Sequence, residues 1–161
     1  MEKENKKNDE CCPKFDPTLW KDRTFDWTDK LFATDKVTCL FHIPLNMGPV
    51  ITKMMRKIEA ENAFSPDFLM LSYDPSPWAS EQFLPVVKEV TGLKHVKLSG
   101  NFITKVFEGP YQEAKNWHTE MYSLAQAQGK TAIRVYFYYT TCPKCAKKYG
   151  KNYVVGFAQV E

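Results

Sequence analysis

The sequence contains no apolar run near the roughly 20 residues that a membrane-spanning helix needs. Its first ten residues are mostly charged and lack the apolar stretch that a signal peptide requires. These two absences predict a cytoplasmic protein with no membrane partner. In that compartment the five cysteines are expected to be thiols or metal ligands rather than disulfides.

The sequence also has little excess charge of either sign. The 161 residues carry a net charge of +3, and no long basic stripe interleaves with aromatic residues, so nucleic acid is not expected as a partner. No Ser-His-Asp or Cys-His spacing supports a nucleophilic triad. Aromatic residues, in contrast, are abundant at 14% and can fill a core or line an apolar pocket.

The chain divides into three parts by composition. Residues 1–10 cannot bury apolar area and are expected to be a disordered tail. Residues 11–36 show neither helical nor strand periodicity, and we interpret them as an irregular arm that packs its aromatics on the body. Residues 37–161 form a single domain of a length that supports a core.

Within that domain the apolar patterns predict six strands and two helices. The strands are expected over 37–43, 68–73, 82–90, 95–107, 132–139 and 153–160, and the helices over 47–62 and 110–128. A Gly-Pro pair opens each helix. The order strand-helix-strand-strand in 37–91 recurs in 95–161, which indicates an internal duplication. The predicted fold is α+β: duplicated β-α-β-β units form one antiparallel-rich sheet with two helices on one face and a cleft on the other.

The turn from Glu108 to Tyr111 is the first candidate site. It places the Glu108 carboxylate between the end of a strand and the start of a helix. One interpretation is a solvated first-turn acid stabilised by the helix dipole. The other is a pocket acid that acts as a general base or cation partner, if aromatic walls raise its pKa.

Five aromatic residues are candidates for the walls of the cleft. Tyr136 and Tyr138 share one face of the strand 132–139 with Arg134, and we expect this face to look into the cleft. Trp78, which follows Pro77 in a turn, either caps the core or covers the cleft. The remaining candidates are Tyr111 and Trp117.

The pair Cys142 and Cys145 forms a Cys-x-x-Cys motif, which suits a zinc knuckle or a redox dithiol. A structural zinc would need four ligands, and Cys11 and Cys12 could complete the set if the arm docks at this loop. A plain pair of loop thiols is the other outcome. No other cofactor is expected.

Four stretches carry a resemblance to a known family: Cys11-Cys12-Pro13, residues 41–46, residues 107–111 and residues 139–145. Together with the element order over 37–161, they resemble the GyrI-like small-molecule-binding domains of the SOUL-related superfamily, in a stand-alone bacterial subgroup. The resemblance implies a cleft between the repeats for bulky apolar or cationic molecules. It also implies that some members are hydrolases that use a pocket glutamate with a tyrosine or tryptophan. Glu108 and Tyr111 best match these roles, although many members carry His or Arg where this chain has Glu108.

Three functions follow as expectations. The first is a stand-alone binding module, monomeric or weakly dimeric, for an amphipathic or apolar small molecule. The second is a hydrolase in which Glu108 directs water and a tyrosine orients it. The third is an interaction protein built on a metal-stapled loop.

Overall fold

The computed structural model describes residues 17–41, 43–66, 69–110, 113–139 and 153–161. Within these ranges no helix is long and apolar enough to cross a membrane. The elements, in chain order, are η1 (Pro17–Leu19), β1 (Thr24–Leu40), β2 (Ile43–Pro44), α1 (Met47–Ala60), β3 (Leu71–Ser76), β4 (Ala79–Pro85), β5 (Lys94–Glu108), α2 (Ala114–Ala127), β6 (Ala132–Tyr139) and β7 (Tyr153–Val160).

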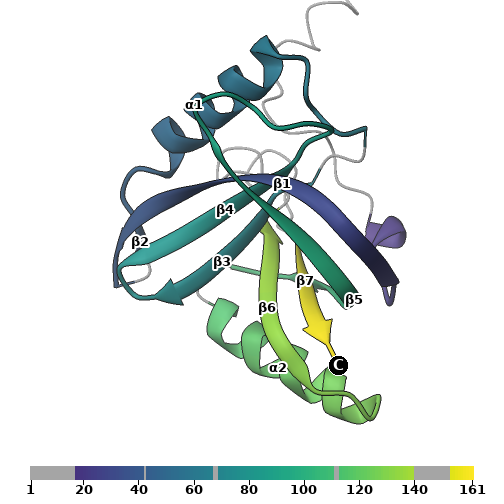
Figure 1. Ribbon diagram of the computed structural model, residues 1–161. Coiled ribbons are helices and arrows are strands. Elements are labelled where there is room, and N and C mark those ends of the chain that lie inside the picture. The colour runs from purple at the N-terminus through teal and green to yellow at the C-terminus, as the bar shows by residue number, and fades with distance from the viewer. Residues whose placement is uncertain (1–16, 42, 67–68, 111–112, 140–152) are drawn as a thin grey trace, which may run out of the picture.

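Six strands form a closed antiparallel barrel in the order β1-β4-β3-β6-β7-β5, with β5 pairing back to β1 (Figure 1). Closure depends on the 17-residue strand β1. Phe32 in its middle pairs with Pro85 of β4 on one side and with Val96 of β5 on the other. The fold is α+β as predicted, but the predicted single sheet with a cleft on one face is instead a closed barrel, because the first strand of the order, β1, pairs with the last, β5.

Strand β1 was missed over residues 24–36, which were expected to be an irregular arm. A register shift lies between Trp27 and Lys30, and Asp29 within it has a positive φ of 49°. Such a bulge breaks the alternation by which a strand is recognised, because side chains on either side of it change their spacing. The strand is therefore real, but its period is interrupted.

The other elements follow the prediction with small shifts. Strands β6 and β7 have the expected bounds, and β3 ends at Ser76, beyond the strand expected over 68–73. The order strand-helix-strand-strand occurs twice, and the pairing β1-β4-β3 in the first half corresponds to β5-β7-β6 in the second. An origin by duplication stays a prediction.

The barrel interior is filled by aromatic side chains. The Trp27 and Phe102 rings have centroids 4.5 Å apart, and Phe157 stacks on both Trp27 and Phe25. Each large apolar side chain buried in this way contributes about 1.5–3 kcal/mol to stability. The buried members of the interior cluster are Phe32, Leu69, Leu71, Phe83, Leu98, Phe102, Tyr136, Tyr138, Val155 and Phe157.

Both helices lie outside the barrel, on opposite sides of it (Figure 1). Helix α2 packs Trp117 and Met121 against the outer face of β5, β6 and β7. Helix α1 packs Met54 and Ile58 against a cluster that includes Ala33 of β1. The helices therefore share the outer face of the sheet, and the inner face is left for other residues.

Candidate functional site

Four polar side chains gather at one part of the inner face. Tyr73 of β3 and Glu81 of β4 are direct register partners, so their side chains leave the same face with Cβ atoms about 4.5–5.5 Å apart. Tyr136 of β6 lies beside Tyr73, with ring centroids 5.7 Å apart. Arg134 is two residues before Tyr136 in the same strand and faces the same side.

Arg134 holds this cluster together. Its guanidinium carbon lies 4.5 Å from the centroid of the Tyr73 ring, a cation–π contact. The guanidinium also donates a hydrogen bond to the Tyr136 hydroxyl, and this bond raises the pKa of Arg134. Arg134 therefore stays charged, and although its side chain is exposed it contacts two tyrosines.

Tyr136 is only 1% exposed. Burial raises the pKa of its hydroxyl, because the phenolate would lose its water. The hydrogen bond from Arg134 opposes this effect, and the nearby charge of Glu81 adds to it. Tyr136 is thus a neutral phenol at physiological pH and cannot act as a base.

The cluster joins the two halves of the chain. Tyr73 and Glu81 come from the first half, and Arg134 and Tyr136 from the second. The halves meet here along β3 and β6, where Ser72 and Phe137 form the only residue pair within the described strands. These polar residues therefore converge where the two halves of the chain meet.

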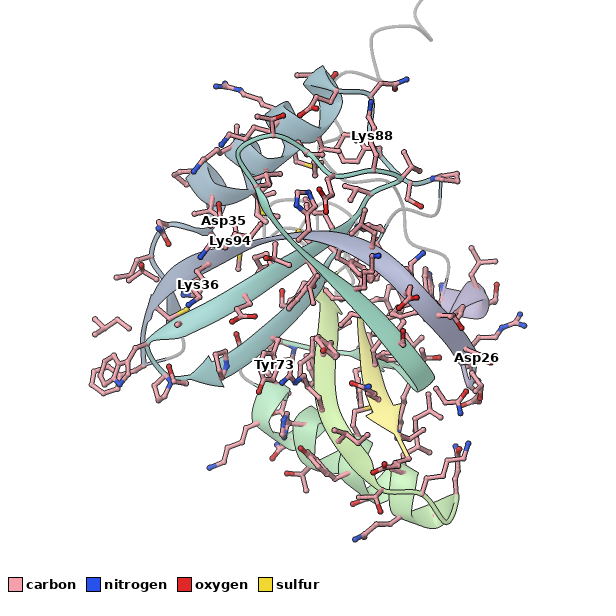
Figure 2. The ribbon with its side chains drawn as sticks, in the orientation of Figure 1. Asp26, Asp35, Lys36, Tyr73, Lys88 and Lys94 are labelled. Atoms are coloured by element: carbon pink, nitrogen blue, oxygen red, sulfur yellow. The ribbon has the colours of Figure 1, made fainter. Side chains whose placement is uncertain are left out.

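A cavity of about 340 Å³ opens beside Glu81, within the range of about 300–1,000 Å³ that is typical of small-molecule sites. It lies between β1, β4, the start of β5 and helix α1, and Figure 2 shows Asp35, Lys36 and Lys94 gathered there. The lining residues are Thr34, Asp35, Lys36, Lys53, Glu81, Gly92, Leu93 and Lys94.

The two carboxylates of this cavity differ in their partners. Asp35 accepts a hydrogen bond from the Lys36 backbone N–H at 2.8 Å and lies 3.9 Å from the Lys53 ammonium. Glu81 is half-buried, and within the described ranges its carboxylate forms no hydrogen bond or ion pair. Glu81 is therefore the carboxylate that is available to a bound molecule.

The residues that the sequence singled out are spread over the barrel. Glu108 is exposed at the end of β5, opposite Tyr153. Trp117 is 6% exposed and stacks on Phe107 between α2 and the outer face of the sheet. Trp78 is 54% exposed in the β3–β4 turn. Of the predicted site residues that the structure describes, only Tyr136 lies in the polar cluster.

Tyr138 points into the barrel interior, where the centroid of its ring lies 5.9 Å from that of Trp20. It is buried among aromatics rather than exposed to a cleft. Tyr111, Cys11, Cys12, Cys142 and Cys145 lie outside the described residues. Among the residues that are described, no group of three or more His, Cys, Asp or Glu is placed to hold a metal ion, and the zinc site stays a prediction.

Sequence reasoning missed Tyr73 and Glu81. The sequence predicts a strand that ends at Tyr73 and a returning strand that begins only at Gln82, so Glu81 falls outside both predicted strands. Both faces of β4 are largely buried, so the strand shows no apolar–polar alternation that would indicate which face carries Glu81. The signal that existed was Arg134, which the sequence placed on the same face as Tyr136.

Together the closed barrel and the outer helices define a small α+β barrel with a polar cluster on its inner face. The chain belongs to the family described as "Bacterial hydrolase", whose model matches residues 2–160. No curated protein matches it. Membership of the GyrI-like superfamily stays a prediction.

Three solved structures share the fold at low sequence identity. An uncharacterized conserved protein from Listeria innocua has a TM-score of 0.60 at 12% identity, over 88% of this chain and 92% of that one. A hydrolase from Listeria innocua has a TM-score of 0.59 at 14% identity, over 99% and 98%. The EcmrR C-terminal domain has a TM-score of 0.62 at 10% identity, over 89% and 98%.

Proposed function

We propose that the chain is a small-molecule hydrolase whose carboxylate is Glu81. The observation that carries this proposal is the convergence of three groups beside a cavity of about 340 Å³. They are the Glu81 carboxylate, which has no hydrogen bond or ion pair to the residues that the structure describes, the half-exposed phenol of Tyr73 and the guanidinium of Arg134. The family assignment gives independent support, because the family is described as hydrolases. A catalytic carboxylate with a tyrosine is also what the resemblance implied, here with Glu81 in place of Glu108.

The proposed chemistry needs only water and an activated or strained substrate. Glu81 takes a proton from water while the water oxygen forms a bond to the electrophilic carbon. The bond from that carbon to its leaving group breaks, and the protonated Glu81 returns the proton to the leaving group. The proton balance closes with no external oxidant, reductant or metal.

The other residues of the cluster position the reacting groups and stabilise the negative charge that develops on the substrate. Tyr73 is half-exposed and donates a hydrogen bond to the substrate oxygen on which negative charge develops. Arg134 adds a fixed positive charge over the Tyr73 ring. Tyr136 is buried and acts as a positioning residue, because its hydroxyl holds the guanidinium in place.

The first test replaces each candidate acid in turn. In Glu81→Gln, hydrolysis of activated probes (4-nitrophenyl acetate and styrene oxide) should fall at least about 100-fold, as expected on loss of a general base, while probe binding persists. Glu108→Gln is the matched variant at the exposed end of β5, and it should retain turnover. Rates are measured by release of nitrophenolate and of diol.

Two results would reassign the site. Loss of turnover in Glu108→Gln with full activity in Glu81→Gln would favour the acid that the sequence indicated. Full activity in both variants would show that neither Glu81 nor Glu108 is the catalytic carboxylate.

A second candidate is a binding module without turnover. The half-exposed ring of Tyr73 in the polar cluster favours it, since an accessible aromatic ring gives affinity for flat apolar molecules. Under this function the probes bind to the wild-type protein but are not hydrolysed, and Glu81→Gln changes affinity alone.

A further inference from the structure

The cavity beside Glu81 carries more positive than negative charge. Its lining includes Lys36, Lys53 and Lys94 against Asp35 and Glu81. Lys53 and Asp35 face each other at 3.9 Å and offset one another. Within the part of the chain that the structure describes, Lys36 and Lys94 form no ion pair. Two ammonium groups are thus left facing one free carboxylate.

Strand register places these groups on the same face. Lys36 pairs with Glu81 across β1 and β4, and Thr34 pairs with Lys94 across β1 and β5. Thr34 and Lys36 are two residues apart in β1, so they share a face. Both ammonium groups therefore belong to the same inner face as the polar cluster.

The wall of the cavity already binds an oxyanion supplied by the chain. Strand β5 begins at Lys94, so β1 is not covered by β5 beyond Thr34. The Lys36 backbone N–H on this stretch is bonded to the Asp35 carboxylate at 2.8 Å rather than to a strand. Asp35 already uses this backbone donor, so a bound anion at this edge would be held by the lysine ammonium groups.

The aromatic ring next to Glu81, in contrast, already has a cation. Arg134 lies over the Tyr73 ring at 4.5 Å. An organic cation would have to displace Arg134 from this ring and would meet Lys36 and Lys94 as well. These contacts disfavour the cationic ligands that the family resemblance implied.

We propose that the cavity is an anion subsite that takes a carboxylate or phosphate group of a small aromatic molecule. Lys36 and Lys94 bind the anionic group, and the aromatic part extends toward Tyr73. If the proposed hydrolase function holds, this assignment names its substrate class. The binding of anions itself does not depend on that function.

Isothermal titration with one aryl scaffold in four charge forms tests the subsite. The probes are phenyl phosphate, benzoate, benzyl alcohol and benzylamine. Phenyl phosphate and benzoate should bind more tightly than benzyl alcohol, and benzylamine should bind least. Added NaCl should weaken binding of both anions, because exposed charge interactions are screened. The ratio of the two anion affinities identifies whether phosphate or carboxylate is preferred.

Single variants give the expected effects in both directions. Lys36→Gln and Lys94→Gln should each weaken phenyl phosphate binding about three- to fivefold, as expected for one partly exposed charge contact. Asp35→Asn should tighten it about threefold, because it removes a competing carboxylate and frees Lys53. Lys115→Gln, on helix α2, is the control and should leave the affinity unchanged.

Several results would overturn the subsite. They are equal affinity for anionic and neutral probes, no binding of either anion, or an unchanged affinity in both Lys36→Gln and Lys94→Gln. The proposed hydrolysis fails separately, through Glu81→Gln. If that variant keeps turnover while the lysine variants lose phenyl phosphate, the subsite stands and the assignment of Glu81 falls.

Discussion

At the scale of single residues, the protonation of Tyr136 is set by opposing neighbours. Burial favours its neutral form, while the hydrogen bond from Arg134 favours the phenolate. The net result is a raised pKa. The folded protein therefore keeps this proton at a pH where the unfolded chain loses it, and the folded state binds more protons in that window.

This pKa shift predicts alkaline destabilisation. The contribution of Tyr136 to stability is fully present below the unfolded tyrosine pKa of about 10 and is lost as the pH rises through the higher folded value. The free energy of unfolding, measured by urea titration from neutral to alkaline pH, should fall above about pH 10. Tyr136→Phe should show a shallower fall.

Tyr122→Phe is the control, since this tyrosine is 40% exposed on α2. It should retain the wild-type slope. If Tyr136→Phe keeps the full slope, the buried phenol is not the group responsible.

At the scale of elements, the packing of α2 on the barrel depends on a glycine in β7. A Cβ at Gly156 would lie 2.6 Å from the Met121 Sδ and 3.1 Å from the Phe107 Cε2. Met121 is fully buried, so its side chain cannot move out of the way into solvent. The absence of a side chain at this position is what allows helix and sheet to approach.

Gly156→Ala should therefore destabilise the fold by about 1–3 kcal/mol, the usual cost of overpacking a core. Gly48→Ala is the matched control, because Gly48 lies in the first turn of α1 and a Cβ added there would meet no atom within 4 Å. That variant should be neutral or gain up to about 1 kcal/mol from helix propensity. The stabilities of the two variants are compared by urea unfolding. Equal midpoints would contradict this account of the α2 interface.

At the scale of the whole molecule, the barrel has one broad and one narrow junction between its halves. Strands β1 and β5 pair over nine residue positions, from Thr24 to Thr34. Within the described strands, β3 and β6 share the single pair Ser72 and Phe137. Fewer ladder contacts mean a lower cost of local opening.

This asymmetry predicts that the barrel opens between β3 and β6, next to the polar cluster. Hydrogen exchange followed by NMR should show faster exchange for the amides between β3 and β6 than for those between β1 and β5. Phenyl phosphate should slow exchange at the narrow junction if the ligand bridges the halves. Equal protection at both junctions would show that the barrel opens elsewhere or only globally.

The sequence by itself determined the local elements and their order. Apolar periodicity is a short-range property, so it located α1, α2, β6 and β7, and it placed Arg134 and Tyr136 on one face of their strand. It also predicted antiparallel strands with two helices, because each amphipathic unit must bury its apolar face against another.

Only the tertiary structure decided that the sheet closes and where its polar residues meet. Closure rests on pairing between residues far apart in the chain, and the bulge between Trp27 and Lys30 hid the strand that provides it. Glu81 and Tyr73 become neighbours of Arg134 through the same long-range pairing. Glu108 has a distinctive local sequence but an exposed position. The reason is physical: periodicity fixes which way a side chain points from its own strand, whereas its neighbours are fixed by which strands pair.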